Sequence, residues 1–290
     1  MDAGAGLRCA GLIAANLARI VAAALAEDLG GGDVTTLATV PKAARAIARA
    51  RCKSSLVVAG GEVFARVFYE VDPGLRVERK LADGDRAEAG SVLWEVEGSA
   101  RSILMAERTA LNFAQRLSGI ATLTRRFVDA VPQGSSLRIA DTRKTTPGLR
   151  ALERQAVRSG GGHNHRNDLS SAVLIKDNHI AAAGGISAAI TRARQSAPHT
   201  SRIEVEVESL AALEEALNAG ADIVMLDNFA AQDIAEAVRL ARGRALVEVS
   251  GGVTLERIPE LARAGVDVVS VGALTHSAPA ADISLDLEAL

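Results

Sequence analysis

Aromatic residues are scarce in this chain of 290 residues: five Phe, one Trp and one Tyr make up 2% of the sequence. Surfaces that bind single-stranded nucleic acid need aromatic side chains on which the bases stack. Basic residues are interspersed with acidic ones, the formal net charge is −2, and no basic tail is present. We therefore expect no nucleic-acid partner.

Cysteine and long apolar runs are scarce as well. The two cysteines, Cys9 and Cys52, are too few for a disulfide framework or a cysteine-based metal site. The alanine-rich run that ends at Ala26 is interrupted by Asn16 and Arg19. No window reaches the ~20 apolar residues that a membrane span needs. These features predict a cytoplasmic protein, in a reducing compartment, with no membrane partner.

Lysine is the third scarce residue, since only five of the 33 basic residues are lysines. Two of the five, Lys144 and Lys176, lie in the segment 141–180, which also holds three of the five histidines. An ammonium is a compact point charge, whereas the guanidinium of Arg is a planar fork. The segment carries seven Lys and Arg residues against four acids. It therefore predicts a site for anions in a chain that is slightly acidic overall.

Apolar periodicity divides the chain into two parts. Before Pro132, helices alternate irregularly with short strands, which is typical of an α+β domain; the expected helices are 12–29, 62–71, 102–118 (with Ser102 as N-cap) and 120–131, and the expected strands are 43–58, 77–81 and 92–96. After Gly134, short apolar runs alternate with helical segments; the runs are 137–140, 172–176, 203–208, 222–226, 245–249 and 266–271, and the helices are 149–159, 185–196, 209–219, 230–242 and 254–264.

This second pattern predicts parallel strands joined by crossover helices. Six strands fit either a partial barrel or an open doubly wound sheet, and we expect the barrel. No G-x-G-x-x-G follows the first strand, so the pattern carries no dinucleotide-binding signal.

Polar residues follow each of the six predicted strands directly. They are 141–144, 176–178, Glu208, 227–228, 250–252 and Gly272. In a barrel the carboxyl ends of the strands converge on one face, where binding sites form. We therefore expect these residues to meet in one site.

The strand 203–208 is unusual because Glu204, Glu206 and Glu208 alternate with valines. A period of two puts the three carboxylates on one face. If that face points into the barrel, the carboxylates need cationic partners, and Arg143, Lys144 and Lys176 are the expected ones. The alternative is an edge strand with one face in water.

Glycines follow the last two predicted strands, in Ser250-Gly251-Gly252 and at Gly272. Barrel enzymes commonly bind phosphate at this position, through backbone N–H groups and a helix N-terminus. Taken alone, each motif is more simply interpreted as a tight turn. Together, opposite a cationic segment, they predict a phosphate cradle.

Several motifs resemble those of the quinolinate phosphoribosyltransferases, also called nicotinate-nucleotide pyrophosphorylases (carboxylating). The resemblance covers nearly the whole chain in order. It is carried by Glu-Asp-Leu-Gly and Asp-Val-Thr-Thr (27–36), Glu-Arg-Thr-Ala-Leu-Asn (107–112), Asp-Thr-Arg-Lys-Thr (141–145), Gly-Gly-Gly-x-Asn-His-Arg (160–166), Ile-Lys-Asp-Asn-His (175–179), Glu-Val-Glu-Val-Glu (204–208), Leu-Asp-Asn-Phe (226–229), Ser-Gly-Gly (250–252) and Val-Gly-Ala-Leu-Thr-His-Ser (271–277).

The resemblance implies a fold, an assembly and a reaction. The fold is an α/β type II phosphoribosyltransferase-like one: an N-terminal α+β sandwich domain (1–118, joined by the tail 278–290) followed by a parallel α/β barrel of about seven strands (119–277). The assembly is a homodimer. The reaction joins quinolinate to phosphoribosyl pyrophosphate with magnesium, and releases nicotinate mononucleotide, pyrophosphate and carbon dioxide.

Chemistry then suggests roles for the site residues. Arg108, Arg143 and Arg166 suit carboxylates because the guanidinium fork binds them bidentately, and His165 can add a hydrogen bond. Lys144 and Lys176 suit phosphate oxygens as point charges. Glu206 and Asp227 can hold magnesium, directly or through water, or stabilise positive charge on the ribose; with the two lysines they are the expected catalytic residues. Thr142, Ser250, Gly251, Gly252 and Gly272 complete the expected substrate-binding set.

Other polar residues have simpler interpretations. Arg150, Arg154 and Arg158 repeat along one helix, as on a solvated face or a dimer contact, and we expect His163 and His199 on the surface. A phosphate contact for His276 stays open. The resemblance implies that Arg108 acts in the partner subunit's site, and the alternative is a surface pair with Glu107 or Asp129.

Three other functions remain possible from sequence. A paralogue can use another acid, since motifs shared within the family do not identify the ring. An aldolase can form a Schiff base at Lys176. A non-catalytic phosphate-binding barrel has no need of the Glu206 and Asp227 carboxylates.

Overall fold

The computed structural model describes the backbone of residues 3–290 and the side chains from Asn16 onward. Cys9, one of the chain's two cysteines, lies outside these described side chains. The chain forms two compact units: Met1–Leu123 with Thr146–Gly160 and Ala278–Leu290, and Thr124–Thr145 with Gly161–Ser277. No helix in the described part of the chain is long and apolar enough to cross a membrane.

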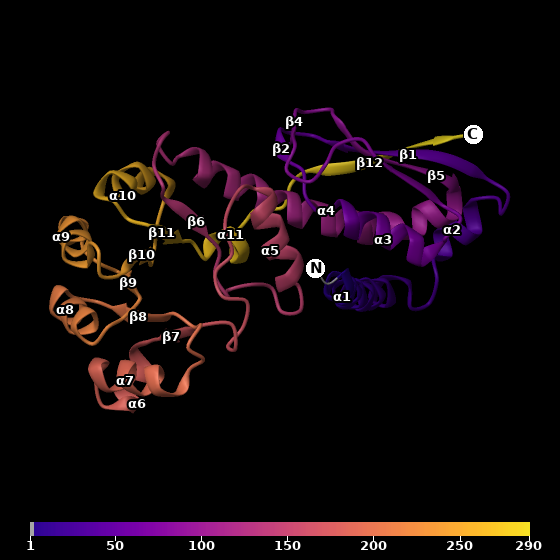
Figure 1. The fold of residues 1–290 in the computed structure, drawn as a ribbon. Coiled ribbons are helices and arrows are strands. Elements are labelled where there is room, and N and C mark those ends of the chain that lie inside the picture. Colours follow the sequence, from indigo (N-terminus) through magenta and orange to yellow (C-terminus); the bar gives the residue numbers. More distant parts are fainter. Residues whose placement is uncertain (1–2) are drawn as a thin grey trace. The chain divides into compact units, whose positions relative to one another are not determined.

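The first unit contains an antiparallel sheet in the order β12-β1-β5-β3, with helices beside it (Figure 1). Its elements are α1 (Ala3–Leu29), α2 (Val34–Thr39), β1 (Arg45–Cys52), β2 (Leu56–Val57), α3 (Gly61–Val71), β3 (Arg76–Arg79), β4 (Arg86–Ala87), β5 (Val92–Ser99), α4 (Ala100–Asp129), whose last residues belong to the second unit, α5 (Arg150–Ser159) and β12 (Ile283–Ala289). The predicted helices and the strands at 77–81 and 92–96 are confirmed. The predicted strand 43–58 is instead two strands, β1 and β2, which belong to different sheets, and α2, β4 and β12 were not predicted.

Two details of α4 differ from the expectation. It is one helix where two were predicted, and it begins at Ala100, so Ser102 is not its N-cap. Ser102 N donates instead to Ser99 Oγ at 3.3 Å. Gly119 lies inside this helix, and only glycine fits there, because a Cβ would stand 2.0 Å from the carbonyl oxygen of Pro279. A glycine in a helix interior normally weakens it, and here it admits the crossing C-terminal segment.

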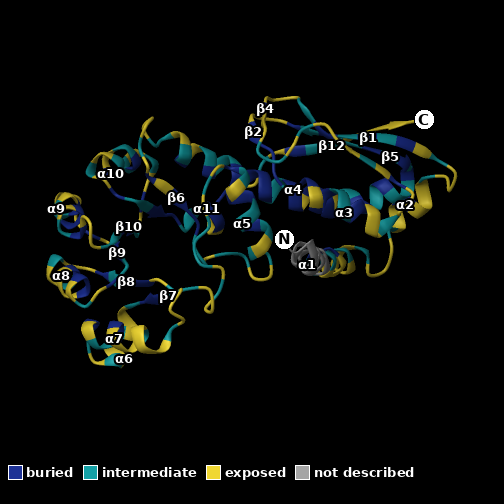
Figure 2. Ribbon diagram, in the orientation of Figure 1, coloured by how far each residue is buried: buried dark blue, intermediate teal, exposed yellow. Residues whose placement is uncertain are grey.

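The core of the first unit is built from alternating strand residues and one face of α3. Val63, Phe64, Val67 and Phe68 are buried at the i, i+3, i+4 spacing of an amphipathic helix (Figure 2). Phe64 stacks on Trp94 of β5 with ring centroids 4.6 Å apart. Three of the chain's few aromatic residues are thus used in the core.

The second unit is a parallel sheet in the order β6-β11-β10-β9-β8-β7. Its elements are β6 (Arg138–Ala140), β7 (Val173–Ile175), α6 (Asp177–Ala183), α7 (Ile186–Ser196), β8 (Ile203–Val207), α8 (Leu210–Asn218), β9 (Ile223–Asp227), α9 (Ala231–Ala241), β10 (Leu246–Ser250), the 3-10 turn η1 (Leu255–Arg257), α10 (Ile258–Ala264), β11 (Val268–Ser270) and α11 (Ala273–His276). All six predicted strands are confirmed, and α8 packs against β8 and β9 while α9 packs against β10 (Figure 1).

A seventh chain segment extends this sheet beyond β6. His163 forms a parallel bridge with Ala140, through hydrogen bonds from Asp141 N to His163 O (3.0 Å) and from His163 N to Ile139 O (2.8 Å). The segment around His163 therefore occupies a strand position next to β6, which accords with the roughly seven strands that the family resemblance implied.

Strand register puts the chemically important side chains on one face. β8 pairs with both β7 and β9, so the edge-strand alternative for the glutamate-rich strand is wrong. Glu206 of β8 is opposite Met225 of β9, and Met225 is opposite Glu248 of β10. Two residues further along the strands, Asp227 is opposite Ser250. Because side chains alternate along a strand, these residues and Glu204 share a face.

Candidate active site

A cavity of about 670 Å³ lies where the strands of the parallel sheet end. All of the predicted site residues except Arg108 line it, together with His276: Thr142, Arg143, Lys144, His165, Arg166, Lys176, Glu206, Asp227, Ser250, Gly251, Gly252 and Gly272. Segments far apart in sequence meet here because the carboxyl ends of parallel strands converge.

Lys176 and Glu206 form the ion pair at the centre of the cavity lining. Lys176 directly follows β7 and caps α6, and its backbone N–H donates to His179 Nδ1 at 3.0 Å. Its ammonium contacts the Glu206 carboxylate of β8, one of the pairings expected from the sequence. An ion-paired ammonium carries no lone pair, so this geometry does not suit attack on a carbonyl carbon.

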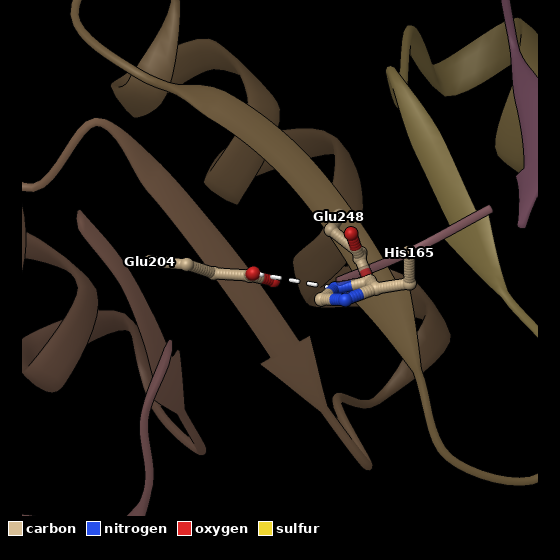
Figure 3. A group of neighbouring side chains, drawn as sticks. All are labelled: His165, Glu204 and Glu248. Atoms are coloured by element: carbon tan, nitrogen blue, oxygen red, sulfur yellow. Dashed lines mark ion pairs between the residues drawn. The ribbon is translucent and has the colours of Figure 1, made fainter. Parts of the chain in front are cut away.

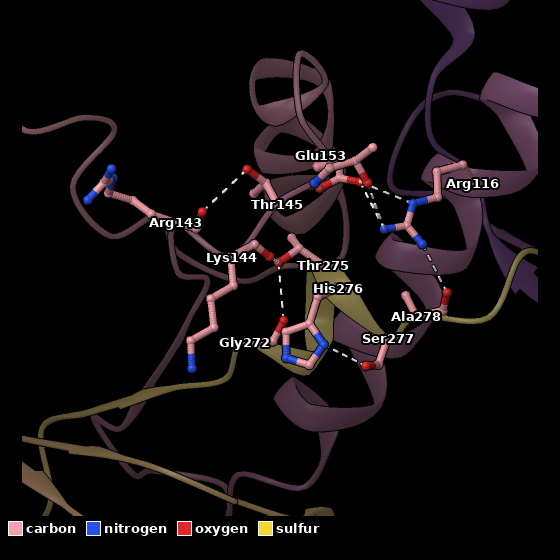
Figure 4. Close-up of polar contacts among 11 residues, drawn as sticks. Arg116, Arg143, Lys144, Thr145, Glu153, Gly272, Thr275, His276, Ser277 and Ala278 are labelled. Carbon is pink, nitrogen blue, oxygen red and sulfur yellow. Dashed lines mark hydrogen bonds and ion pairs between the residues drawn. The ribbon is translucent and has the colours of Figure 1, made fainter.

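The loop after β6 is held against α11 by a buried hydroxyl. Thr275 Oγ donates to Lys144 O at 2.8 Å, with a longer contact of 3.2 Å to Gly272 O (Figure 4). A Cβ on Gly272 would lie 3.2 Å from both the Lys144 chain and the His276 ring, so a larger residue would displace these two side chains. Thr275 was not predicted as a site residue, although it belongs to the Thr-His-Ser motif.

The turns after β9 and β10 pack directly on each other. Gly251 has φ +86°, and a Cβ there would stand 2.6 Å from Asn228 Oδ1 and 3.0 Å from Asp227 Oδ1. Asn228 itself has φ 52°, a left-handed conformation that Asn tolerates better than most residues. Gly252 has φ +57° with no atom within 4 Å of a Cβ position, which leaves room for ligand atoms beside its backbone.

A buried cluster of His165, Glu204 and Glu248 lies beneath the cationic lining. His165 Nε2 is 3.3 Å from Glu204 Oε2 and 3.5 Å from Glu248 Oε1 (Figure 3). Glu204 and Glu248 are only 5% and 3% exposed. Their Oε1 atoms have no hydrogen-bond partner among the described residues. The partners predicted for Glu204 were Arg143, Lys144 and Lys176, so its contact with His165 differs from that prediction. Glu248 was not predicted as a site residue, although the period of two from Ser250 puts it on the same face.

The cluster holds more protons than its isolated groups would. Burial lowers the pKa of His165, but the interactions with Glu204 and Glu248 outweigh it and raise this pKa to about 10. Burial raises the pKa of Glu204, and the Glu248 charge adds to this effect. Because the Arg166 N–H donates to His165 Nδ1 at 2.7 Å, that nitrogen presents a lone pair. The ring proton therefore lies on Nε2, which faces the two glutamates, and the raised pKa belongs to the three groups together.

The Asp141 side chain binds the segment that carries His165, partly through the backbone of that segment. This carboxylate is fully buried and accepts hydrogen bonds from His165 N (2.7 Å) and Asn164 Nδ2 (2.5 Å). His165 is therefore held at its backbone by Asp141 and at its ring by two glutamates.

Two groups of acids are candidates for a divalent ion. Glu206 and Asp227 present carboxylate oxygens from neighbouring strands, which is the ligand type that Mg²⁺ prefers. The ligand atoms of His165, Glu204 and Glu248 also lie within 4.8 Å of one another. A metal-bound histidine normally donates its other ring N–H to an acceptor, whereas His165 Nδ1 accepts from Arg166. The geometry therefore favours a proton, not a metal, in the buried cluster.

Arg166 and Arg143 are neighbouring cations of the cavity. Burial lowers the pKa of Arg166, the Arg143 charge lowers it further, and the Glu204 charge raises it. Arg166 Nη1 donates to Ala172 O at 3.3 Å. Like charges repel unless an anion lies between them, so the pair is suited to bind an anionic ligand.

Arg108 belongs to the first unit, where it is exposed on α4. It lines a small cavity of about 200 Å³ with Glu27 and Asp28. Burial raises the pKa of the adjacent Glu107, and the Arg108 charge lowers it. Among the described residues, Arg108 and Glu107 form no ion pair. His163 and His199 are exposed, as expected.

The parallel sheet and its cationic cavity define an α/β protein whose site is suited to bind anions and carries the carboxylates of Glu206 and Asp227. The model of the quinolinate phosphoribosyl transferase C-terminal domain matches residues 120–286, and that of the N-terminal domain matches residues 33–118. The chain therefore belongs to the quinolinate phosphoribosyltransferase family, and the expected type II phosphoribosyltransferase fold is confirmed.

Individual relatives agree with this assignment. The chain is 46% identical to the nicotinate-nucleotide pyrophosphorylase (carboxylating) of Mycobacterium leprae, over 91% of this chain and 94% of the relative. It is 43% identical to the probable enzyme of the same name in Bacillus subtilis, over 90% of each chain. The crystal structure of NadC from Streptococcus pyogenes superposes with a TM-score of 0.89 at 45% identity, covering 94% of this chain and 96% of that one.

Proposed function

We propose that this protein transfers the phosphoribosyl group of phosphoribosyl pyrophosphate to quinolinate and releases pyrophosphate and carbon dioxide. The product is nicotinate mononucleotide, an intermediate of de novo NAD biosynthesis. The observation that carries this proposal is the gathering of Arg143, Lys144, Arg166 and Lys176 around one cavity. One substrate is a dicarboxylate and the other carries several phosphates, so a site for both needs this many cations.

The proposed roles follow from the shape and charge of each group. Arg143 and Arg166 bind the quinolinate carboxylates, because a guanidinium binds a carboxylate through two hydrogen bonds. Lys144 and Lys176 bind phosphate oxygens as point charges. The backbone at Gly251, Gly252 and Gly272 receives the 5′-phosphate, assisted by Thr142, Ser250 and His276.

Glu206 and Asp227 act at the ribose in this proposal. As pyrophosphate leaves, positive charge develops on the sugar, and nearby carboxylates stabilise it. The same two residues would hold magnesium, directly or through water, and the bound ion would neutralise pyrophosphate charge. Attack by the ring nitrogen of quinolinate forms the bond to the ribose. The resulting cationic nitrogen stabilises the carbanion left when the 2-carboxylate departs as carbon dioxide, and that carbon then takes up a proton from solvent to give nicotinate mononucleotide.

The proposed domain and subunit arrangement follows the family. Residues 1–118 with the tail 278–290 form the N-terminal domain, and 119–277 form the catalytic barrel. The protein works in the cytoplasm as a homodimer in which Arg108 completes the partner's site. The exposure of Arg108 and its lack of an ion pair with Glu107 among the described residues support availability for such a role.

The activity is tested by supplying quinolinate, phosphoribosyl pyrophosphate and magnesium, and measuring carbon dioxide and nicotinate mononucleotide. We expect both products in equal amounts and none without magnesium. Nicotinate in place of quinolinate is the control. Turnover of nicotinate but not of quinolinate would contradict the proposed substrate.

The role of Arg108 is tested by mixing two inactive variants, Arg108→Ala and Glu206→Ala. If Arg108 acts in trans, each mixed dimer holds one site in which both residues are intact. Random reassortment then makes half of all dimers mixed, and activity returns to roughly a quarter of wild type. Subunit exchange is verified with differently tagged chains, and no recovery after proven exchange would contradict action in trans.

A further inference from the structure

The two ring nitrogens of His165 face different partners. Its Nδ1 accepts from the Arg166 amide, and its Nε2 faces Glu204 and Glu248. A substrate carboxylate would receive a hydrogen bond from this ring only by competing with two buried carboxylates. The ring therefore holds its neighbours in addition to lining the cavity.

Three buried acids hold the segment that carries Arg166. Asp141 accepts from the His165 amide at 2.7 Å, while Glu204 and Glu248 hold the ring at 3.3 and 3.5 Å. The ring in turn holds the Arg166 amide at 2.7 Å. The contacts of this chain span 2.7 to 3.5 Å, so the backbone from which the Arg166 guanidinium extends is held from two directions.

The cost of this arrangement suggests that it has a function. Buried carboxylate oxygens without hydrogen bonds destabilise a fold, and one such oxygen is present on each glutamate. On Glu248 this is Oε1, whose 3.5 Å contact with His165 Nε2 is an ion pair and not a hydrogen bond. Binding sites must hold their ligand groups within a fraction of an ångström, which requires supporting residues of this kind.

We propose that Glu204 and Glu248 are positioning residues that act through His165 on Arg166 and thereby set the affinity for the pyridine dicarboxylate. The part concerning affinity rests on the proposed function, whereas the part concerning the ring does not. Neither glutamate touches substrate, and neither takes part in the transfer to the ribose.

The test uses pairs of variants in the full-length protein. Glu204→Leu and Glu248→Leu remove the acceptors, and each is expected to raise the KM for quinolinate about tenfold. The KM for phosphoribosyl pyrophosphate and kcat stay within about threefold of wild type, because their residues are held elsewhere. Glu204→Gln keeps an acceptor oxygen without a charge and is expected to restore the wild-type KM. Glu214→Gln, on the exposed side of α8, is the matched control.

Two further measurements separate positioning from a general loss of structure. Replacing a buried acid by an apolar residue is often neutral or stabilising, so the melting temperatures of the Leu variants are expected to hold while affinity falls. Nitrogen-15 NMR of the imidazole is expected to show an unprotonated Nδ1 in wild type and a mixture of tautomers in both Leu variants, with His165→Gln used to assign the signals.

The outcomes are distinct. Unchanged ring signals, or an unchanged KM in both Leu variants of an active enzyme, would overturn the inference. A wild-type protein that does not turn over quinolinate would overturn the proposed function instead, and the ring signals would still decide whether the glutamates hold His165.

Discussion

Buried glutamates occur in both units of this protein, and their surroundings differ. In the first unit, Glu153 is fully buried and accepts four hydrogen bonds: from Arg116 Nε (3.1 Å) and Nη2 (2.9 Å), and from Thr146 N (3.1 Å) and Oγ (2.7 Å) (Figure 4). In the second unit, Glu204 and Glu248 share one imidazole, and each has an oxygen without a hydrogen bond (Figure 3).

The difference separates two uses of a buried charge. A carboxylate with a guanidinium and two further donors is compensated, and its surroundings join three segments of the first unit. Carboxylates that share one ring are under-compensated, and burial together with the neighbouring Glu248 charge raises the pKa of Glu204. The first arrangement stabilises the fold, and the second supports a binding site at some cost in stability.

The largest expected effect comes from breaking the compensated arrangement. Arg116→Met leaves the Glu153 charge buried without its main partner, and we expect a loss of about 3–5 kcal/mol in the free energy of unfolding. Urea unfolding followed by circular dichroism measures it. The double variant Arg116→Met/Glu153→Leu should regain most of this loss, and an unchanged midpoint in the single variant would show that Glu153 is not held as described.

Next in size is the loss of the charge that faces the cavity. Lys176→Ala should lower kcat/KM for the proposed reaction about 10²- to 10³-fold, because a preorganised charge at developing phosphate charge is lost. Borohydride treatment of wild type with carbonyl compounds should trap no adduct on Lys176. A stable adduct would favour the aldolase alternative.

A smaller change in the free energy of unfolding is expected when Glu153 and Glu204 are each replaced by Gln, and it should differ between the two sites. Glu153→Gln replaces a carboxylate that accepts four hydrogen bonds, and should cost about 1–3 kcal/mol of stability. Glu204→Gln keeps an acceptor oxygen for His165 and removes a buried charge, and should change stability very little. Equal losses in matched urea titrations would show that the two buried carboxylates are compensated alike.

The smallest expected effect is a difference in how stability depends on pH. The folded-state pKa values of Glu204 and His165 lie above their usual 4.5 and 6.5, and that of His165 reaches about 10. Raised pKa values contribute stability that is present at low pH and lost as the pH rises through the folded-state values. Between pH 6.5 and about 10, wild type should therefore lose stability, and Glu204→Gln should lose less. Parallel curves from urea unfolding would contradict this.

The sequence by itself determined the strands of the second unit and the residues at their ends. Apolar runs and crossover helices are local patterns, so they predicted β6 to β11 and hence which residues would line the cavity. The period of two along β8 likewise predicted that Glu204 and Glu206 share a face, and the contact of Glu206 with Lys176 is confirmed. The motifs identified the family before any contact was known.

Only the tertiary structure decided which partner each buried acid has. Glu204 and Glu248 meet His165 because β8 and β10 lie on either side of β9 and the segment after His163 runs beside β6. β12 pairs with β1 across more than half of the chain, and no local pattern indicated it. Hydrophobic periodicity reports which way a side chain faces, whereas its partner depends on sheet order and register, which are set by contacts between residues distant in sequence.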